Sequence, residues 1–322
     1  MNVAVLGLGS AGSRHARNLL VLGHDVVAFD PGSVASPENV ARAGSLESAI
    51  ESTEVVIVAS PNSLHAAQAV AALEAGRHVL VEKPLATTVG DAERIVEAAA
   101  LAQVTCGVAM NLRFHAGVLG LRNLLGTNAL GTPMLAQASF GYDLRRWHPA
   151  SDYRQSYSAR AELGGGIVFD AIHELDYLLW LLGPILSVAG EAGHVSELGV
   201  DVEDTAVATV RFASGALGTI DVNFVEPAYR RTCLIVGSRA VARWDWRSSS
   251  ITVSREGADD SVIDTRCDVS ETYRAELVDF FAALNAGRPP ATPADDGLAA
   301  VRLADGIKRS AALGRRVMLD RD

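Results

Sequence analysis

The chain has 322 residues, of which 49% are hydrophobic and 20% are charged, and its formal net charge is −10. This is the composition of an ordinary globular protein, and the length predicts two domains. An acidic balance with no basic run or basic helix face argues against nucleic acid as a partner. No apolar stretch has the length of a membrane span, and the N-terminus lacks the cationic segment of a signal peptide, so we expect no membrane partner.

The first hundred residues predict strands that alternate with helices. Apolar runs indicate strands at 3–6, 24–29, 54–59, 78–81 and 103–108, and the segments between them indicate helices at 13–22, 46–52, 63–75 and 89–102. Continuous apolar runs are typical of strands buried on both faces, and their alternation with helices indicates a parallel, doubly wound sheet. We therefore expect an α/β domain over residues 1–116.

The pattern changes after about residue 115. A helix is predicted at 117–125, a strand at 134–142, an irregular stretch at 143–162 and a helix at 167–182. Strands then follow without helices between them, at 185–192, 205–212, 216–223, 232–236 and 240–245, and residues 257–260 are typical of a hairpin tip. Two helices, 271–286 and 294–313, and a short strand at 316–319 close the chain.

Consecutive strands indicate a largely antiparallel, open sheet. Residues 117–322 are therefore predicted to form an α+β substrate-binding domain, whose final helix and strand, about 291–322, can pack back on the first domain. The open sheet offers a face for self-association, so we expect a homodimer or homotetramer.

The first predicted strand leads into three glycines, Gly7, Gly9 and Gly12, and then into a helix. This is the order that a dinucleotide site needs, because Gly7 permits the turn, Gly9 lets the backbone approach a pyrophosphate, and Gly12 lets helix and strand pack closely. The helix N-terminus presents free N–H groups to the phosphates, so Ser10 and Ala11 join the predicted cofactor contacts. The sequence thus predicts a Rossmann domain.

Asp30 follows the second predicted strand, 18 residues after Gly12. A carboxylate near this spacing binds ribose hydroxyls and favours NAD, since it would repel the 2′-phosphate of NADP. The residues that follow, Pro31, Gly32 and Ser33, supply no cation to offset that repulsion. The alternative is that Asp30 only begins an Asp-Pro-Gly turn.

Polar residues also follow the strand predicted at 54–59. Ser60 and Asn62 come directly after it, and His65 follows three residues later. In a parallel sheet this is the cofactor edge, so all three are candidate cofactor contacts. Asn62 can equally well cap the following helix.

Glu82 and Lys83 follow the strand predicted at 78–81 and lie at the same edge. A lysine there can bind a substrate hydroxyl, and burial near a nicotinamide cation would lower its pKa until it accepts a proton. The alternative is an ordinary surface Glu–Lys pair at a strand end.

Three glycines, residues 164–166, open the helix predicted at 167–182, which carries Asp170 and His173. Residues at i and i+3 share a helix face, and a carboxylate beside an imidazole is a general acid–base arrangement. The alternatives are a helix-terminal acid with a core histidine, or a metal pair, which no further His or Cys cluster supports. Three widely spaced cysteines indicate neither a disulfide framework nor zinc, so we expect no metal and a cytoplasmic protein.

The remaining candidates for substrate contact lie in the second half. Arg113 follows the strand predicted at 103–108 and is suited to an anionic or hydroxylated substrate. Aromatic side chains crowd the irregular stretch, where they either stack on a sugar or pin the loop to its domain: Trp147, Tyr153 and Tyr157, with His148 and Arg154 beside them.

Together these motifs resemble the glucose-fructose oxidoreductase / inositol dehydrogenase / rhizopine-catabolism (GFO/IDH/MocA) family. Residues 7–15 resemble its opening fingerprint, 60–65 its second cofactor motif, 82–84 its lysine tripeptide, and 164–176 its glycine-rich helix with a catalytic Asp and His. The resemblance implies an NAD(P)-dependent oxidoreductase, with NAD preferred, that acts on a carbinol of a sugar, cyclitol or sugar nucleotide.

The resemblance also implies roles for three residues. His173 is the general base, Asp170 orients it, and Lys83 polarises the substrate oxygen. One departure is that family members space the Asp and His four residues apart, whereas Asp170 and His173 are three apart. A one-residue shift rotates a side chain by about 100° around a helix, so we favour His173 over Asp170.

Two alternatives remain open from the sequence. One is a redox-neutral member of the family that uses NAD to cleave a glycosidic bond by hydrolysis or elimination. The other is a nucleotide-binding regulator without turnover.

Overall fold

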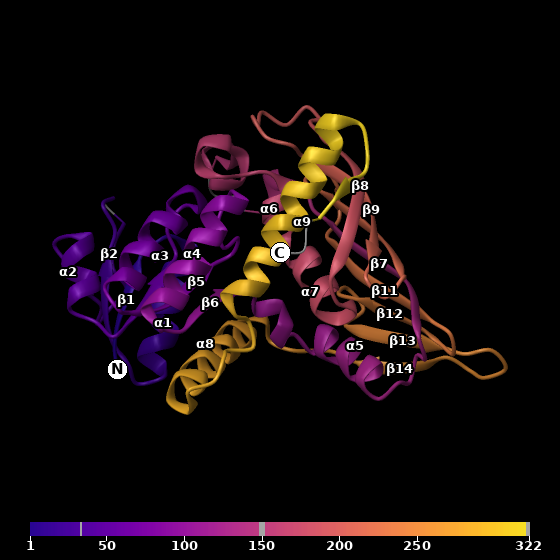
Figure 1. Cartoon of the computed structure of the whole chain (residues 1–322), viewed down its shortest axis with the longest axis horizontal. Helices are drawn as coiled ribbons and strands as arrows, with labels where there is room; N and C mark the ends of the chain where they lie inside the picture. The colour runs from indigo at the N-terminus through magenta and orange to yellow at the C-terminus, as the bar shows by residue number, and fades with distance from the viewer. Residues whose placement is uncertain (33, 148–151, 320–322) are drawn as a thin grey trace. The chain divides into compact units, whose positions relative to one another are not determined.

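The computed structural model describes residues 1–32, 34–147 and 152–319 (Figure 1). They divide into two compact units, Met1–Asn111 with Ser270–Val301, and Leu112–Val269 with Arg302–Asp322. This division differs from the predicted boundary at residue 116. Helix α8 (Val269–Ala286) belongs almost wholly to the first unit, because Leu277, Phe280 and Phe281 join the hydrophobic core of that unit. Helix α9 (Ala294–Leu313) contributes to both units.

The first unit contains a six-stranded sheet in the order β3-β2-β1-β4-β5-β6, and every neighbouring pair is parallel. This confirms the predicted doubly wound sheet, since helices alternate with the strands along the chain. Its strands are β1 (Asn2–Leu6), β2 (Asp25–Phe29), β3 (Ala41–Arg42), β4 (Val55–Val58), β5 (His78–Glu82) and β6 (Cys106–Ala109). Its helices are α1 (Ser10–Val21), α2 (Leu46–Glu51), α3 (His65–Glu74) and α4 (Val89–Ala102), together with α8.

Strand register brings the predicted cofactor motifs to one edge of this sheet. Leu6, the last residue of β1, pairs with Phe29 of β2 on one side and with Val58 of β4 on the other. Val58 in turn pairs with Val81 of β5. Because parallel strands end together, the residues that follow β1, β2, β4 and β5 lie along a single edge.

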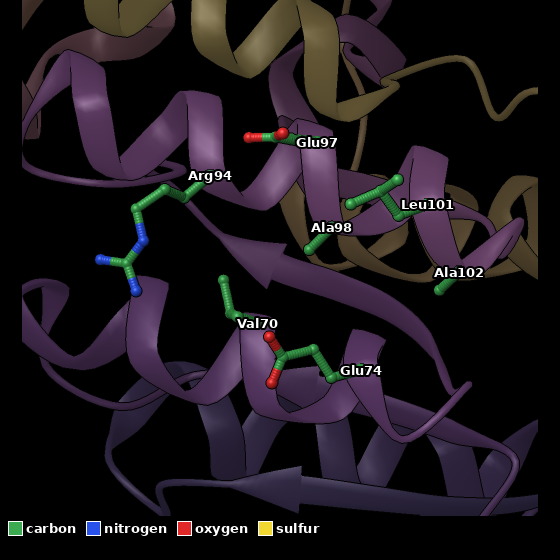
Figure 2. A pocket seen from close by; sticks show the side chains of 7 residues that line it. All are labelled: Val70, Glu74, Arg94, Glu97, Ala98, Leu101 and Ala102. Carbon is green, nitrogen blue, oxygen red and sulfur yellow. The ribbon is translucent and has the colours of Figure 1, made fainter.

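An open groove lies between α3 and α4 in the first unit. Arg94 beside it is already ion-paired, with its Nη1 atom 3.0 Å from Oδ1 of Asp91. None of the residues predicted for the site lines the groove, so we exclude it from the candidate site. Figure 2 shows its lining side chains, Val70, Glu74, Arg94, Glu97, Ala98, Leu101 and Ala102.

The second unit contains a nine-stranded sheet in the order β14-β13-β12-β11-β7-β10-β9-β8-β15. Only β7 and β10 pair in parallel, so the prediction of a largely antiparallel sheet is confirmed. The strands are β7 (Pro133–Gly141), β8 (Ile185–Gly193), β9 (Thr205–Phe212), β10 (Leu217–Asn223), β11 (Arg230–Gly237), β12 (Val241–Asp245), β13 (Ser250–Ser254), β14 (Ser261–Asp264) and β15 (Val317–Met318).

One face of this sheet is buried and the other is open. Along β9 and β11 alternate residues are buried, as expected where helices cover one face only. Helix α7 (Ile172–Leu182) packs against β7, and α5 (Ala116–Gly126) packs against β12. On the open face Leu135, Val207 and Leu217 each expose more than 40% of their surface.

The structure departs from the predicted elements at a few points. The helix predicted at 167–182 is broken into α6 (Ile167–Asp170) and α7 by Ala171, whose ψ of 23° leaves the helical range. Strands β3, β13 and β14 were not predicted. Strand β3 has only two residues, and β14 is exposed along its whole length. The hairpin tip at 257–260 was predicted, and β13 and β14 pair on either side of it. Among the described residues of the irregular stretch, 3-10 turns lie at Leu144–Arg146, Tyr153–Gln155, Tyr157–Ala159 and Ala161–Leu163.

Candidate active site

The structure explains the absence of a side chain differently at each of the three glycines after β1. Gly7 has φ +90°, its N–H donates to the Phe29 carbonyl at 2.8 Å, and a Cβ there would lie 2.6 Å from the carbonyl oxygen of Ala59. A Cβ on Gly12 would lie 1.9 Å from the carbonyl oxygen of Gly7. A Cβ on Gly9 would meet nothing within 4 Å. The fold thus requires glycine at 7 and 12, whereas glycine at 9 leaves room for something outside the chain.

The start of α1 is suited to an anion. No side chain caps this N-terminus, so its first N–H groups stay available around the exposed Ser10 and the half-buried Ala11. The Ser13 hydroxyl instead donates to the Leu8 carbonyl at 2.8 Å, which fixes the loop. The open space at Gly9 and this uncapped helix end fit a dinucleotide pyrophosphate.

Asp30 braces the glycine loop and also makes the turn that follows β2. Its Oδ2 atom accepts from the Leu8 N–H at 2.7 Å, and its Oδ1 atom accepts from the Gly32 N–H at 2.7 Å. The Asp-Pro-Gly turn is therefore real, and the carboxylate retains lone pairs for a ribose. The residues that follow Asp30 in the sequence include no nearby cation, but Arg42 from β3 donates to the backbone carbonyls of Asp30 and Val34, each at 2.5 Å.

The segment after β4 contains a histidine that connects two loops, His65, and a serine with a buried hydroxyl group, Ser60. His65 is fully buried, and its Nδ1 and Nε2 atoms lie 2.8 and 2.9 Å from the carbonyl oxygens of Pro84 and Ser60. Burial lowers the pKa of His65, although both carbonyls oppose this shift. His65 therefore ties the two motif loops together. The Ser60 hydroxyl is buried and has no partner among the described residues, and Asn62 is buried in the turn that precedes α3. An orphaned hydroxyl at this edge fits a polar ligand.

Glu82, at the end of β5, makes a buried contact that the sequence did not predict. Its Oε1 atom lies 2.8 Å from Nε2 of His15 on α1, and its Oε2 atom accepts from the Lys83 N–H at 3.1 Å. Burial alone would raise the pKa of Glu82, but the His15 hydrogen bond and nearby positive charges lower it below its usual value. The glycine fingerprint and the lysine tripeptide are thus connected by a side-chain contact, beside the half-buried Lys83.

The triple glycine of the second unit packs against its own chain. A Cβ on Gly165 would lie 2.2 Å from the Tyr157 carbonyl oxygen, and one on Gly166 would lie 2.3 Å from Oε1 of Glu203. Glu203 also caps the short helix α6, since its carbonyl accepts from the Ile167 N–H at 3.1 Å. These close approaches explain why glycines precede the predicted catalytic segment.

Asp170 and His173 do not share one continuous helix, which corrects the prediction. Asp170 is the last residue of α6 and His173 is the second residue of α7, with the break at Ala171 between them. Both side chains are at least nine-tenths buried. Because the helix is broken here, the rotation of about 100° that a one-residue shift produces in a continuous helix does not apply to this pair.

Two buried ion pairs hold α7 at residues that directly follow His173. Arg231 of β11 donates from Nε to Oε1 of Glu174 at 2.7 Å. Arg113 donates from Nε and Nη2 to the two carboxylate oxygens of Asp176, at 2.9 and 2.5 Å. Arg113, which we expected to contact the substrate, is thus bound to Asp176, and the sequence did not predict a role for Arg231. Nothing local identifies Arg231, because its partner lies 57 residues away along the chain.

The aromatic residues of the irregular stretch differ in accessibility. Trp147 donates from Nε1 to the Tyr142 carbonyl at 3.2 Å and packs edge-on against Phe224. The Tyr153 hydroxyl accepts from the Gly199 N–H at 3.3 Å. These contacts fix Trp147 and Tyr153 to the second unit, which is the second of the two roles considered for the aromatic residues of this stretch. Tyr157 is 37% exposed, and His148 lies outside the described residues.

Within residues 1–32, 34–147 and 152–319 no three His, Cys, Asp or Glu side chains are grouped as metal ligands. Nor does this part of the chain contain a helix that is both long and apolar enough to cross a membrane.

Two family models match the chain. Residues 1–110 match the oxidoreductase family with an NAD-binding Rossmann fold, and residues 97–243 match the GFO/IDH/MocA C-terminal domain. Inositol 2-dehydrogenase of Salmonella typhimurium (strain LT2) is 27% identical over 340 residues, which cover 99% of this chain and 97% of the relative. A 1,5-anhydro-D-fructose reductase of Ensifer adhaerens is 26% identical over an alignment that covers 83% of this chain and 80% of the reductase.

Solved structures show the same fold. Levoglucosan dehydrogenase in complex with NADH superposes with a TM-score of 0.91 at 22% identity, and all of both chains is covered. The WlbA dehydrogenase of Bordetella pertussis, in complex with NADH and UDP-GlcNAcA, gives a TM-score of 0.85 at 22% identity over 100% and 98% of the two chains. With both domain models matched in order, the chain belongs to the GFO/IDH/MocA family of NAD-binding oxidoreductases.

Proposed function

We propose that this NAD-dependent oxidoreductase acts on a CH–OH carbon of a polyhydroxylated ring, with Lys83 and His173 as its proton-transfer residues. The relatives act on an inositol and an anhydrosugar, as their names state, which supports a cyclitol, sugar or sugar nucleotide as substrate. These relatives are dehydrogenases and reductases, so neither the redox-neutral enzyme nor the regulator gains support from them.

The observation that carries the proposal is the common edge of the first sheet. Gly7, Ser60 and Lys83 follow three neighbouring strands that end together. We assign the pyrophosphate to Gly9, Ser10, Ala11 and Gly12, the adenosine ribose to Asp30, and the nicotinamide end to Ser60, Asn62, Glu82 and Lys83, with His65 as their brace. When bound, NAD supplies the hydride acceptor, and the protein supplies orientation and proton transfer.

The proton-transfer roles follow from side-chain chemistry. An imidazole is the usual group that accepts a hydroxyl proton near neutral pH, so His173 is the general base. Lys83 donates a hydrogen bond to the same substrate oxygen and stabilises the charge that develops on it. Asp170 orients His173 across the break at Ala171.

Among the predicted substrate contacts, Tyr157 has the most accessible ring and is our choice for stacking on the sugar. Arg113, Trp147 and Tyr153 make contacts within the second unit, so we assign them the support of the substrate-binding surface.

We also propose a cytoplasmic homodimer or homotetramer. The free cysteines support a reducing setting, and the open face of the nine-stranded sheet supports self-association. Light scattering of wild type and Val207→Glu measures the assembly directly. If the particle mass of the wild type were that of a monomer, self-association would be refuted.

The test of function is a screen for NADH formation over cyclitols, anhydrosugars and sugar nucleotides. On the substrate found, Lys83→Ala and His173→Asn should each reduce kcat/KM by about 10²–10⁴-fold, the usual contribution of a positioned proton-transfer group. His194→Asn is the matched control, because that histidine is 39% exposed and lies outside the proposed site. Full activity in both site variants would refute the proposed roles.

A further inference from the structure

Glu276 on α8 is a buried carboxyl group that the proposed mechanism does not use. Its exposed fraction is only 3%, and among the described residues neither of its carboxyl oxygens has a hydrogen-bond partner. An ionised carboxylate without donors is very costly to bury, whereas a protonated one is tolerated. The local structure therefore favours the neutral acid.

The charge of Glu82, a second buried carboxyl group in the first unit, acts electrostatically on Glu276, and Glu82 has the opposite surroundings. Glu82 contacts Nε2 of His15 and accepts the N–H of Lys83, and both of these contacts stabilise a negative charge. Arg14, a cation whose charge acts on Glu276, lies over the Tyr273 ring at 4.1 Å from its centroid. Two neighbouring carboxyls with such unequal donors share one charge and one proton.

Electrostatics within the first unit agree with this assignment. Burial, reinforced by the charge of Glu82, raises the pKa of Glu276 well above its usual value, and Arg14 opposes the shift. The pKa of Glu82 is lowered, as described above. The titratable and charged groups around the two carboxyls are Arg14 and His15 from α1, His65 from α3, Lys83 after β5, and Tyr273 from α8.

We propose that Glu276 is a positioning residue that remains protonated, so that the Glu82–Glu276 pair carries one negative charge beside Lys83. A second negative charge there would retain a proton on Lys83 and would strengthen binding of the cationic nicotinamide of NAD⁺ relative to neutral NADH. The inference rests on the proposed placement of the cofactor at this edge, but not on proton transfer by Lys83 or His173.

The first experiment measures the protonation state directly. An infrared difference spectrum between wild type and Glu276→Gln at pH 7 should contain the carbonyl band of a protonated carboxyl group. The control is Glu271→Gln on the same helix, where the glutamate is 55% exposed and ion-paired to Arg274, and its spectrum should show the loss of an ionised carboxylate instead. A carboxylate band for Glu276 at pH 7 would overturn the proposal.

The second experiment titrates NAD⁺ and NADH without substrate between pH 6 and pH 9. In wild type the preference for NAD⁺ over NADH should increase at the pH at which the infrared band shows Glu276 to ionise, and no such increase should occur in Glu276→Gln. Roughly tenfold is expected for a unit charge at ~10 Å and an effective dielectric constant of ~20. Equal pH dependence in the two proteins would refute the role, even if the variants of Lys83 and His173 behave as proposed.

If Glu276→Gln does not fold, isotope-edited NMR of glutamate carboxyl carbons in the wild type gives the same information. One buried carboxyl should then remain protonated well above the usual range for glutamate. Titration of every glutamate in the usual range would exclude the proposal.

Discussion

Nε of Arg231 donates to Oε1 of Glu174 at 2.7 Å, one residue from His173. Both side chains are buried, and the charge of Glu174 raises the pKa of Arg231 against the effect of burial. This pair joins α7 to β11, so the position of the proposed base depends on a strand far along the chain.

Replacement of this arginine tests that dependence. Arg231→Met leaves the Glu174 charge buried without its partner, and we expect a loss of about 3–5 kcal/mol in unfolding free energy. The control is Arg230→Met, the adjacent residue on the same strand, whose pairs with Asp221 and Glu226 are partly exposed and should contribute about 0–1 kcal/mol. Urea unfolding of both variants measures the difference, and equal losses would contradict the assignment.

Two glycine replacements separate the needs of the fold from those of the cofactor. Gly12→Ala forces a methyl group against the Gly7 carbonyl and should cost about 1–3 kcal/mol or more of stability. Gly9→Ala places its methyl group in open space, so its stability should stay within about 0.5 kcal/mol of wild type. NAD affinity should nevertheless fall by roughly tenfold in Gly9→Ala, because the pyrophosphate approaches that backbone. Thermal unfolding and calorimetric NAD titration check both effects. Unchanged NAD binding in Gly9→Ala would place the cofactor elsewhere.

Removal of the His15 side chain tests the contact between α1 and β5. His15→Ala leaves the Glu82 carboxylate without its closest donor, and a hydrogen bond to a charged group contributes about 1.5–3 kcal/mol. We expect a loss of this size in chemical denaturation, together with weaker NAD binding as Lys83 shifts. His194→Ala, at a partly exposed position, should change neither quantity by much. A stable His15→Ala protein would show that the contact matters little.

His115 predicts how stability depends on pH. Burial lowers its pKa from 6.5 to about 4, with a further contribution from Arg231, and its Nδ1 atom accepts the Gly117 N–H at 3.0 Å to cap α5. The unfolded chain therefore binds more protons than the folded protein between these two pH values. The stabilisation is complete above pH 6.5 and is lost as the pH falls towards 4, by about 1–3 kcal/mol.

The matched variant is His115→Asn, which retains a cap acceptor without a titrating ring. Its unfolding free energy should depend less on pH than that of wild type over this range. Parallel curves for the two proteins would rule out His115 as the source.

The glycine turn and the strand ends that we propose for the cofactor were predictable because their signals are local. Gly12 is required by its close approach to Gly7 within one short strand–turn–helix segment, and Ser60 and Lys83 follow apolar runs that identify buried strands. The carboxyl ends of parallel strands meet at one edge, so the order of motifs in the sequence already predicts their neighbourhood. Arg42 was missed because it reaches the Asp30 turn from a two-residue strand that has no sequence pattern of its own.

The sequence by itself determined the two-part α/β architecture, the dinucleotide turn and the use of NAD, because hydrophobic periodicity and glycine spacing act over a few residues. Only the tertiary structure decided that α8 joins the first unit, that the segment with Asp170 and His173 is broken at Ala171, and which partners hold Glu82, Glu174 and Asp176. These outcomes depend on charges and volumes that meet across long separations along the chain. An unpaired charge is costly to bury, so each buried carboxylate needs an ionic or hydrogen-bonding partner. The tertiary structure determines which residue is close enough to be that partner, whereas the neighbouring residues in the sequence do not.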